Sequence, residues 1–103
     1  MRDMKTFKDI KFKPHPVGVG IQGSLNVNGH TLSVVAGDGF YCSPRKNLTS
    51  PNDFDLFEVA VFDSNGNWAT QQFFPNHNDD VVGWQSKMDI SILITKIETL
   101  TIS

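Results

Sequence analysis

The sequence predicts an α+β domain in which a four-stranded antiparallel sheet, built from two hairpins, carries a C-terminal helix across one face. Two observations carry this prediction. An Asn-Gly pair lies between two apolar segments in each of the ranges 17–36 and 54–74, which is typical of a hairpin turn. The range 86–100 instead repeats its apolar residues at helical spacing.

Length and composition indicate a single domain spanning residues 1–103, with 39% hydrophobic residues and eight Phe to build one core. Eleven acidic and nine basic residues give a formal charge of −2, so the chain as a whole has no general attraction for nucleic acid or anionic membranes. Cys42 is alone and therefore excludes an internal disulfide. No segment resembles a signal peptide or a membrane span, and we expect a cytoplasmic protein.

Residues 1–16 form a basic N-terminal segment that holds five of the nine basic residues. Thr6 and Asp9 have the spacing of a capping box and predict a short helical turn. Apolar and basic residues alternate over 10–13, as in an edge strand. We therefore predict a turn followed by a short extended piece that ends at Pro14.

Residues 17–36 are predicted as the first hairpin because apolar residues alternate along 17–27 and Asn28-Gly29 suits a two-residue type I′ turn. This turn sets the register. The facing pairs are Val27 with His30, Leu25 with Leu32, Gly23 with Val34, and Ile21 with Ala36.

Residues 37–53 form a long loop rich in Gly, Ser, Pro and Asn. Loops of more than about 12 residues are uncommon in compact domains and often carry function. The loop mixes aromatic and basic side chains, which favours an interaction surface. Its candidate residues are Phe40, Tyr41, Arg45 and Lys46, with Trp68 from the next range. An equal alternative is that Phe40 and Leu48 pin the loop to the core while its charges are solvated.

Residues 54–74 are predicted as the second hairpin, whose first strand, 56–63, is apolar on both faces except at Glu58. The form of its turn stays open. A two-residue turn makes the facing pairs Phe62 with Ala69 and Phe57 with Phe74, whereas a three-residue loop with Gly66 in the left-handed region pairs Phe62 with Trp68. Pro75 ends the returning strand because it lacks an N–H.

Residues 76–84 are interpreted as a polar connection with a short apolar anchor of Val81, Val82 and Trp84. Ser86 and Asp89 form a capping-box pair that begins the helix 86–100. The β-branched residues leave a strand over part of 90–97 as an alternative. The apolar stripe expected to pack on the sheet is Ile90, Leu93, Ile94, Ile97 and Leu100.

Asp63, Asn65 and Asn67 have the spacing of the first ligands of an EF-hand calcium loop. Trp68 and Phe74 stand where that loop needs Gly and Glu, so the segment is interpreted as a turn.

Other candidates for chemistry also lack a motif. His77, Asp79 and Asp80, with His30 or His15, do not have metal-ligand spacing, and Cys42 has no His at a recognisable nucleophile spacing. We therefore expect no enzyme activity, no metal and no cofactor.

A nucleic-acid role would use the basic N-terminal segment for phosphates and exposed rings for bases. The basic residues are Lys5, Lys8, Lys11 and Lys13, and the rings are Phe40, Tyr41 and Trp68. Because the rest of the chain is net acidic, a solvated basic arm is favoured and a nucleic-acid partner is not expected.

Four segments together resemble a group of small proteins encoded by bacteriophages and prophages. They are FKPHPVGVGIQ at 12–22, VNGHTLSVV at 27–35, LFEVAVFDSNGN at 56–67 and DDVVGW at 79–84. The chain departs from that group in its longer loop 37–53 and at His30-Thr31. The resemblance carries no catalytic residue with it and implies the cytoplasm of a host cell as the location.

Small phage proteins without an active site generally act by binding. The resemblance therefore implies an accessory protein that binds and modulates a host protein, for example as an anti-CRISPR-like inhibitor of a host-defence complex. Two alternatives are a sponge that binds a small molecule or nucleotide between sheet and loop, and a homo-oligomeric structural component, such as a homodimer, paired through edge strands.

Overall fold

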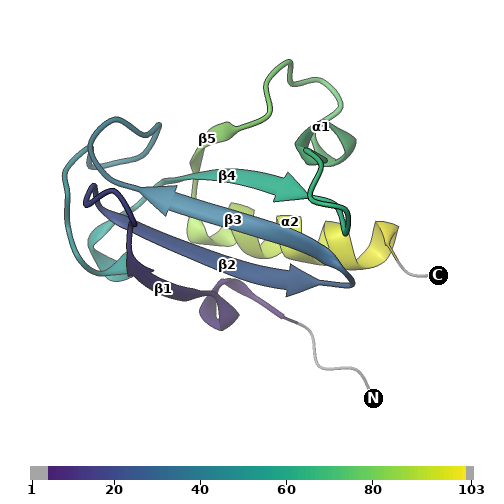
Figure 1. Ribbon diagram of the computed structural model, residues 1–103, viewed down its shortest axis with the longest axis horizontal. Helices are drawn as coiled ribbons and strands as arrows, with labels where there is room; N and C mark the ends of the chain where they lie inside the picture. Colours follow the sequence, from purple (N-terminus) through teal and green to yellow (C-terminus); the bar gives the residue numbers. More distant parts are fainter. Residues whose placement is uncertain (1–4, 102–103) are drawn as a thin grey trace.

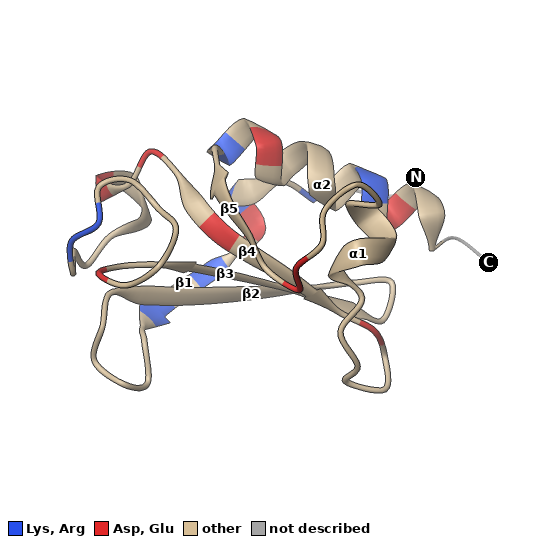
Figure 2. Cartoon of the chain, turned by 90° about the horizontal axis from the view of Figure 1, so that it is seen from above, with Lys and Arg blue, Asp and Glu red and all other residues tan. Residues whose placement is uncertain are grey.

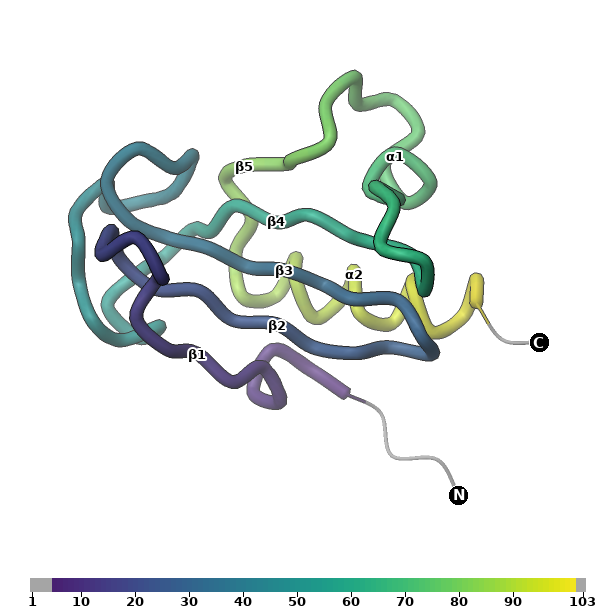
Figure 3. The backbone as a smooth tube through the Cα atoms, viewed as in Figure 1, coloured from purple at the N-terminus to yellow at the C-terminus, as the bar shows by residue number. Residues whose placement is uncertain are grey.

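A computed structural model describes residues 5–101 and shows an α+β fold with one antiparallel sheet (Figure 1). The first four residues of the predicted basic segment lie outside the described residues. The five strands follow one another across the sheet in chain order, as the backbone trace in Figure 3 shows. The elements are η1 (Phe7–Asp9), β1 (Lys11–Pro14), β2 (Ile21–Val27), β3 (His30–Ala36), η2 (Pro51–Asp53), β4 (Phe57–Phe62), α1 (Thr70–Phe73), β5 (Val82–Gln85) and α2 (Lys87–Leu100), where η marks a 3₁₀ helix.

The α+β class and the C-terminal helix agree with the prediction, but the sheet has five strands where four were predicted. The count differs because β1 and β5 both join the sheet, while the predicted return strand of the second hairpin does not form.

The hairpin of β2 and β3 has the predicted register at every pair. Asn28 and Gly29 have φ values of 51° and 89°, in the left-handed region that a type I′ turn requires. The strand begins at Ile21 and not at residue 17, because Gly18 and Gly20 have φ values of 79° and 75° that bend the chain. The prediction is thus confirmed from Ile21 onwards.

The predicted turn and edge strand at the N-terminus are both present. Asp9 Oδ2 accepts a hydrogen bond from Thr6 N at 2.7 Å and completes the capping box of η1. β1 then pairs antiparallel with β2. A side chain at Gly23 would collide with those of Ile10 and Phe12, so this glycine makes room for both side chains to pack over β2.

β4 is the predicted interior strand, and its residues Phe57, Val59 and Val61 are fully buried. The turn after it takes the three-residue form. Gly66 has a φ of 82°, and Phe62 pairs with Trp68 in an isolated bridge.

Beyond Trp68 the predicted return strand is wrong, as are the pairs of Phe62 with Ala69 and Phe57 with Phe74. The chain turns into α1 at Thr70, whose Oγ1 accepts a hydrogen bond from Val61 N at 2.9 Å and replaces a strand partner at that point. α1 then buries Phe73 in the core.

The place beside β4 is taken by β5, which begins within residues 76–84, so the interpretation of that whole segment as a connection is wrong. Phe57 faces Gln85 and Val59 faces Val82, with a register shift between the two pairs. This irregularity marks a β-bulge, which bends a strand and redirects its side chains.

α2 begins with the predicted capping box, in which Ser86 Oγ accepts from Asp89 N and Asp89 Oδ2 accepts from Ser86 N, each at 3.0 Å. Because the helix continues to Leu100, the alternative of a strand over 90–97 is wrong. The predicted stripe is buried except at Leu100, which is 54% exposed. Within residues 5–101, no helix is long and apolar enough to cross a membrane.

The strand register divides the side chains between two faces of the sheet. The covered face packs against α2, as Figure 2 shows, and contains the buried residues of β2, β3 and β4. The open face carries the alternate residues, which are Gln22, Ser24 and Asn26 of β2, Thr31, Ser33 and Val35 of β3, and Glu58, Ala60 and Phe62 of β4.

Candidate functional site

The long loop after β3 is held to the rest of the domain by two of its apolar side chains. Phe40 and Leu48 are half-buried and pack against the core. The Phe40 ring also lies 5.4 Å from the ring of His15. Phe40 therefore supports the loop from within, although the sequence suggested it as a contact residue.

Cys42 is fully buried within the same loop. Its Sγ lies 3.3 Å from Gly37 N and 3.2 Å from Gly37 O, so the thiol closes the start of the loop. At the next residue, Ser43 N donates to Leu56 O at 3.1 Å and ties the loop to the segment that leads into β4.

Tyr41, which lies between Phe40 and Cys42, is held through its backbone, while its side chain is 51% exposed. Tyr41 N donates to Glu58 Oε1 at 3.1 Å, and Tyr41 O accepts from Trp84 N at 2.9 Å. The loop is thereby fastened to β4 and to β5 at one residue.

The side chain of Tyr41 lies at the centre of a group of three. The centroid of its ring is 6.1 Å from that of Trp84 and 6.0 Å from Arg45 Cζ, a distance compatible with a cation–π interaction. Arg45 is exposed, and Trp84 is 51% exposed. We call Tyr41, Arg45 and Trp84 the aromatic surface.

The backbone at Trp84 is strained. Its φ of 59° lies in the left-handed region, where a bulky residue is an outlier. The preceding residue, Gly83, has no room for a side chain, since a Cβ there would collide with Tyr41 Cβ. Strain of this kind persists only where surrounding contacts enforce it, and it is often found at functional sites.

Of the predicted site residues, the structure brings Tyr41 and Arg45 together. Lys46 is exposed on the same loop, and its carbonyl accepts from Leu48 N at 3.0 Å. Trp68 lies elsewhere and packs against Phe62, with ring centroids 4.6 Å apart and the ring planes tilted by 40°.

Trp68 and the aromatic surface nevertheless adjoin the same face of the sheet. Glu58 anchors Tyr41, Phe62 supports Trp68, and both project from the open face of β4. Four residues of a strand span about 13 Å, which separates these two supports. The 54% exposed ring of Trp68 is thus a separate aromatic group at the other end of that face.

Two residues of the site were not predicted to belong to it. Trp84 was interpreted as part of an apolar anchor, and nothing local in the sequence indicates its contact with Tyr41. Glu58 did carry a signal, because it is the one charged residue in an otherwise apolar interior strand.

The segment that resembled a calcium loop is a turn closed by its own carboxylate. Asp63 Oδ1 accepts hydrogen bonds from Asn67 N and Asn65 N, each at 2.9 Å. Both bonds lower the pKa of the Asp63 carboxyl, and the bond from Asn67 N has the larger effect.

The His residues considered for metal binding have separate surroundings. His77 Nε2 lies 2.8 Å from Val81 O, whereas the His30 ring meets Phe73 edge-on at 5.8 Å. In the part of the chain that the structure describes, no three His, Cys, Asp or Glu side chains are grouped to hold a metal ion.

Comparisons with protein-family models, with curated proteins and with solved structures find no match to this chain. Its function must therefore be inferred from its own residues.

Proposed function

We propose that the protein is a binding module for another protein and that the aromatic surface is its contact site. The observation that carries the proposal is the convergence of Tyr41, Arg45 and Trp84, all exposed, from a loop and from β5. Tyr, Trp and Arg are the residue types that most often dominate the energy of protein interfaces.

The support beneath these side chains also favours binding. Tyr41 is held by backbone hydrogen bonds to Glu58 and Trp84, and Gly83 packs against it. A contact group that is already ordered loses less conformational entropy when a partner binds, so its contacts yield more affinity.

The class of partner is supported by the sequence. The resemblance to small phage and prophage proteins favours a host protein, which this chain would bind and modulate, with inhibition of a host-defence complex as one outcome. A binding role requires no catalytic group, and the chemistry of phenol, guanidinium and indole side chains suits it.

The test compares capture of proteins from a host-cell lysate by the wild-type chain and by two variants. Tyr41→Ser removes one ring, and Trp84→Asn removes the other while keeping a residue that tolerates positive φ. Leu100→Ser is the control, because Leu100 is 54% exposed at the far end of α2.

Mass spectrometry should identify a protein retained by the wild type and by the control. Binding of this purified protein should weaken by about tenfold or more in either site variant. Equal affinity for all four chains would contradict the aromatic surface as the contact site.

A further inference from the structure

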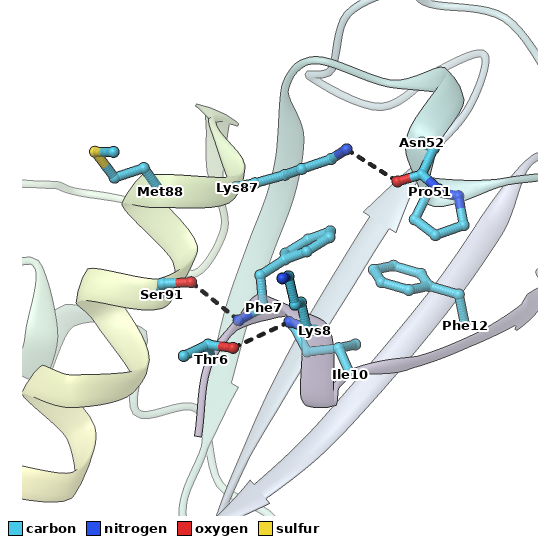
Figure 4. Close-up of a pocket in the computed structure, with 10 residues that line it drawn as sticks. All are labelled: Thr6, Phe7, Lys8, Ile10, Phe12, Pro51, Asn52, Lys87, Met88 and Ser91. Carbon is cyan, nitrogen blue, oxygen red and sulfur yellow. Dashed lines mark hydrogen bonds between the residues drawn. The ribbon is translucent and has the colours of Figure 1, made fainter. Parts of the chain in front are cut away.

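A groove of about 670 Å³ lies on the other side of the molecule from the open face, between η1, η2 and the first turns of α2 (Figure 4). Its walls are mainly apolar and come from segments far apart in the sequence. They include Phe7, Ile10, Phe12, Pro51 and Met88.

The groove continues along α2. A second hollow of about 540 Å³ shares Thr6, Met88 and Ser91 with the first and extends along the helix to Lys96. Met88 and Ile92 are one helical turn apart and are 73% and 60% exposed, so they form an apolar ridge beside the groove. From Lys87 to Lys96 the helix rises about 13 Å, or two to three turns.

The wall formed by η1 is held from two sides. Phe7 N donates to Ser91 Oγ at 2.9 Å, which attaches the segment to α2. The ring centroid of Phe7 also lies 5.1 Å from that of Phe57 and 5.6 Å from that of Phe12, which attaches it to the sheet. The groove is therefore formed before any ligand arrives.

The charge of the groove is opposite to that of the chain. Its described lining residues include Lys5, Lys8, Lys87 and Lys96 but no Asp or Glu, although the chain carries eleven acidic and nine basic residues. Oxygens of neutral groups accept the hydrogen bonds of three of these lysines. The pairs are Lys5 Nζ with Asn26 O, Lys87 Nζ with Asn52 Oδ1, and Lys96 Nζ with Phe73 O.

Three carboxylates on the elements that form the groove keep their negative charge but do not line it. Asp9, Asp53 and Asp89 each accept a hydrogen bond from the backbone N–H of the residue that caps η1, η2 or α2. Among the described residues that line the groove, the charged side chains are thus all lysines, and they form a basic rim around an apolar floor.

We propose that this groove binds an acidic amphipathic helix of a protein partner. A helix placed beside α2 would cover Met88 and Ile92 with its apolar face and bring acidic side chains to the lysines. The groove is open along its length and its apolar ridge protrudes, whereas pockets for small molecules enclose most of the ligand. The site is separate from the aromatic surface and does not depend on it.

The probe for the test is a capped synthetic peptide of about 16 residues, with Leu on one helical face and Glu on the other. Its binding to the full-length ¹⁵N-labelled protein is followed by amide chemical shifts and fluorescence anisotropy. We expect saturable binding that weakens as salt is raised, with shifts concentrated at Phe7, Met88, Ser91 and Ile92. A peptide of the same composition in scrambled order is the control, and its affinity should be lower by about tenfold or more.

Two variants test the apolar ridge and the charged rim separately. Met88→Ser with Ile92→Ser should weaken binding of the peptide by about tenfold, while Leu100→Ser, an exposed apolar change elsewhere on α2, should not. Both positions are more than half exposed, so the fold should survive, which circular dichroism checks.

For the rim, Lys8→Gln with Lys87→Gln should weaken binding by about threefold or more and reduce its salt dependence. Lys13→Gln is the control, because Lys13 lies on β1 opposite Gln22 of the open face.

Three results would overturn the proposal. One is peptide binding that the groove variants leave unchanged, and another is equal binding of the scrambled peptide. The third is binding of dodecanoate or ATP in the groove without binding of the helical peptide, which would assign it to a fatty-acid or nucleotide ligand. Because Tyr41→Ser and Trp84→Asn should bind the peptide normally, failure here is distinguishable from failure of the aromatic surface.

Discussion

The two faces of the sheet are made by the same strands but have different compositions. On β4, Phe57, Val59 and Val61 point to the covered face and are fully buried, while Glu58, Ala60 and Phe62 point to the open face. The first set packs beneath α2, and the second supports exposed rings at both of its ends. Strand alternation thus separates residues that stabilise the domain from residues that present its surface, even where they are adjacent in sequence.

The largest expected effect comes from removing a ring of the covered face. Phe57→Ala should lower the free energy of unfolding by about 3–5 kcal/mol, because the Phe57 ring contacts those of Phe7, Phe12 and Phe54. Its neighbour provides the control, since Glu58→Ala removes only one hydrogen bond, to Tyr41 N, at a half-buried position, and should cost about 1 kcal/mol. Urea denaturation measures both values, and equal losses would contradict the division between the faces.

The next effect tests whether the aromatic surface is packed as tightly as the core. Gly83→Ala places a methyl group against Tyr41 Cβ and should cost about 1–3 kcal/mol of stability. It should also alter the near-ultraviolet circular dichroism of the Tyr41 and Trp84 rings.

Adding Tyr41→Gly to Gly83→Ala removes the atom that collides and serves as the control. In a double-mutant cycle the second change should recover part of the loss. Additive losses would indicate that the two residues are not in tight contact.

A smaller effect on stability is expected at the start of α2, the helix that packs on the covered face of the sheet. Ser86→Ala removes the side-chain acceptor of Asp89 N and should lower the free energy of unfolding by about 1 kcal/mol. Ser64→Ala, at an exposed turn position, should change stability by less than about 0.5 kcal/mol. Thermal denaturation of both variants makes the comparison, and no difference between them would contradict a stabilising role of the capping box.

The smallest effect concerns the turn between the bridged residues Phe62 and Trp68. The Asn67 and Asn65 N–H groups lower the pKa of Asp63 in the folded protein, so their stabilising effect is complete above the unfolded pKa and disappears as pH falls through the lower folded pKa. An NMR titration of the Asp63 carboxyl should give a pKa below its ordinary value of 3.8. Asp63→Asn should remove the loss of stability at low pH that comes from this carboxyl. An Asp63 carboxyl that titrates at 3.8 or above would exclude stabilisation by the Asn65 and Asn67 N–H groups.

The parts of the fold that could be predicted are those determined by nearby residues. The register of β2 and β3 follows from Asn28-Gly29 together with alternation along both strands. The start of α2 follows from Ser86 and Asp89.

The second hairpin could not be predicted because two segments compete for the same edge of β4. The segment after the turn forms one bridge to β4, between Trp68 and Phe62. It then departs from the sheet, because Thr70 Oγ1 accepts the hydrogen bond of Val61 N in place of a strand partner. Val82 pairs with Val59 instead, although β5 has only four residues and contains Gly83, which conceals its strand pattern.

The candidate site was predictable only in part, for the same reason. Tyr41 and Arg45 are close in sequence and indicated a surface, whereas Trp84 joins them through a long-range hydrogen bond and a left-handed backbone. The groove was not predictable, since its walls come from three segments whose proximity depends on the packing of α2.

The hydrogen bond between Phe7 and Ser91 joins residues 84 positions apart and has a consequence for biosynthesis. All five strands leave the ribosome before α2 does, so a sheet that forms at that stage has its apolar face exposed to solvent. The contact between η1 and α2 can form only after Ser91 has emerged. A chain that stalls between β5 and α2 is therefore expected to stay bound to chaperones, because it lacks the helix that covers the apolar face.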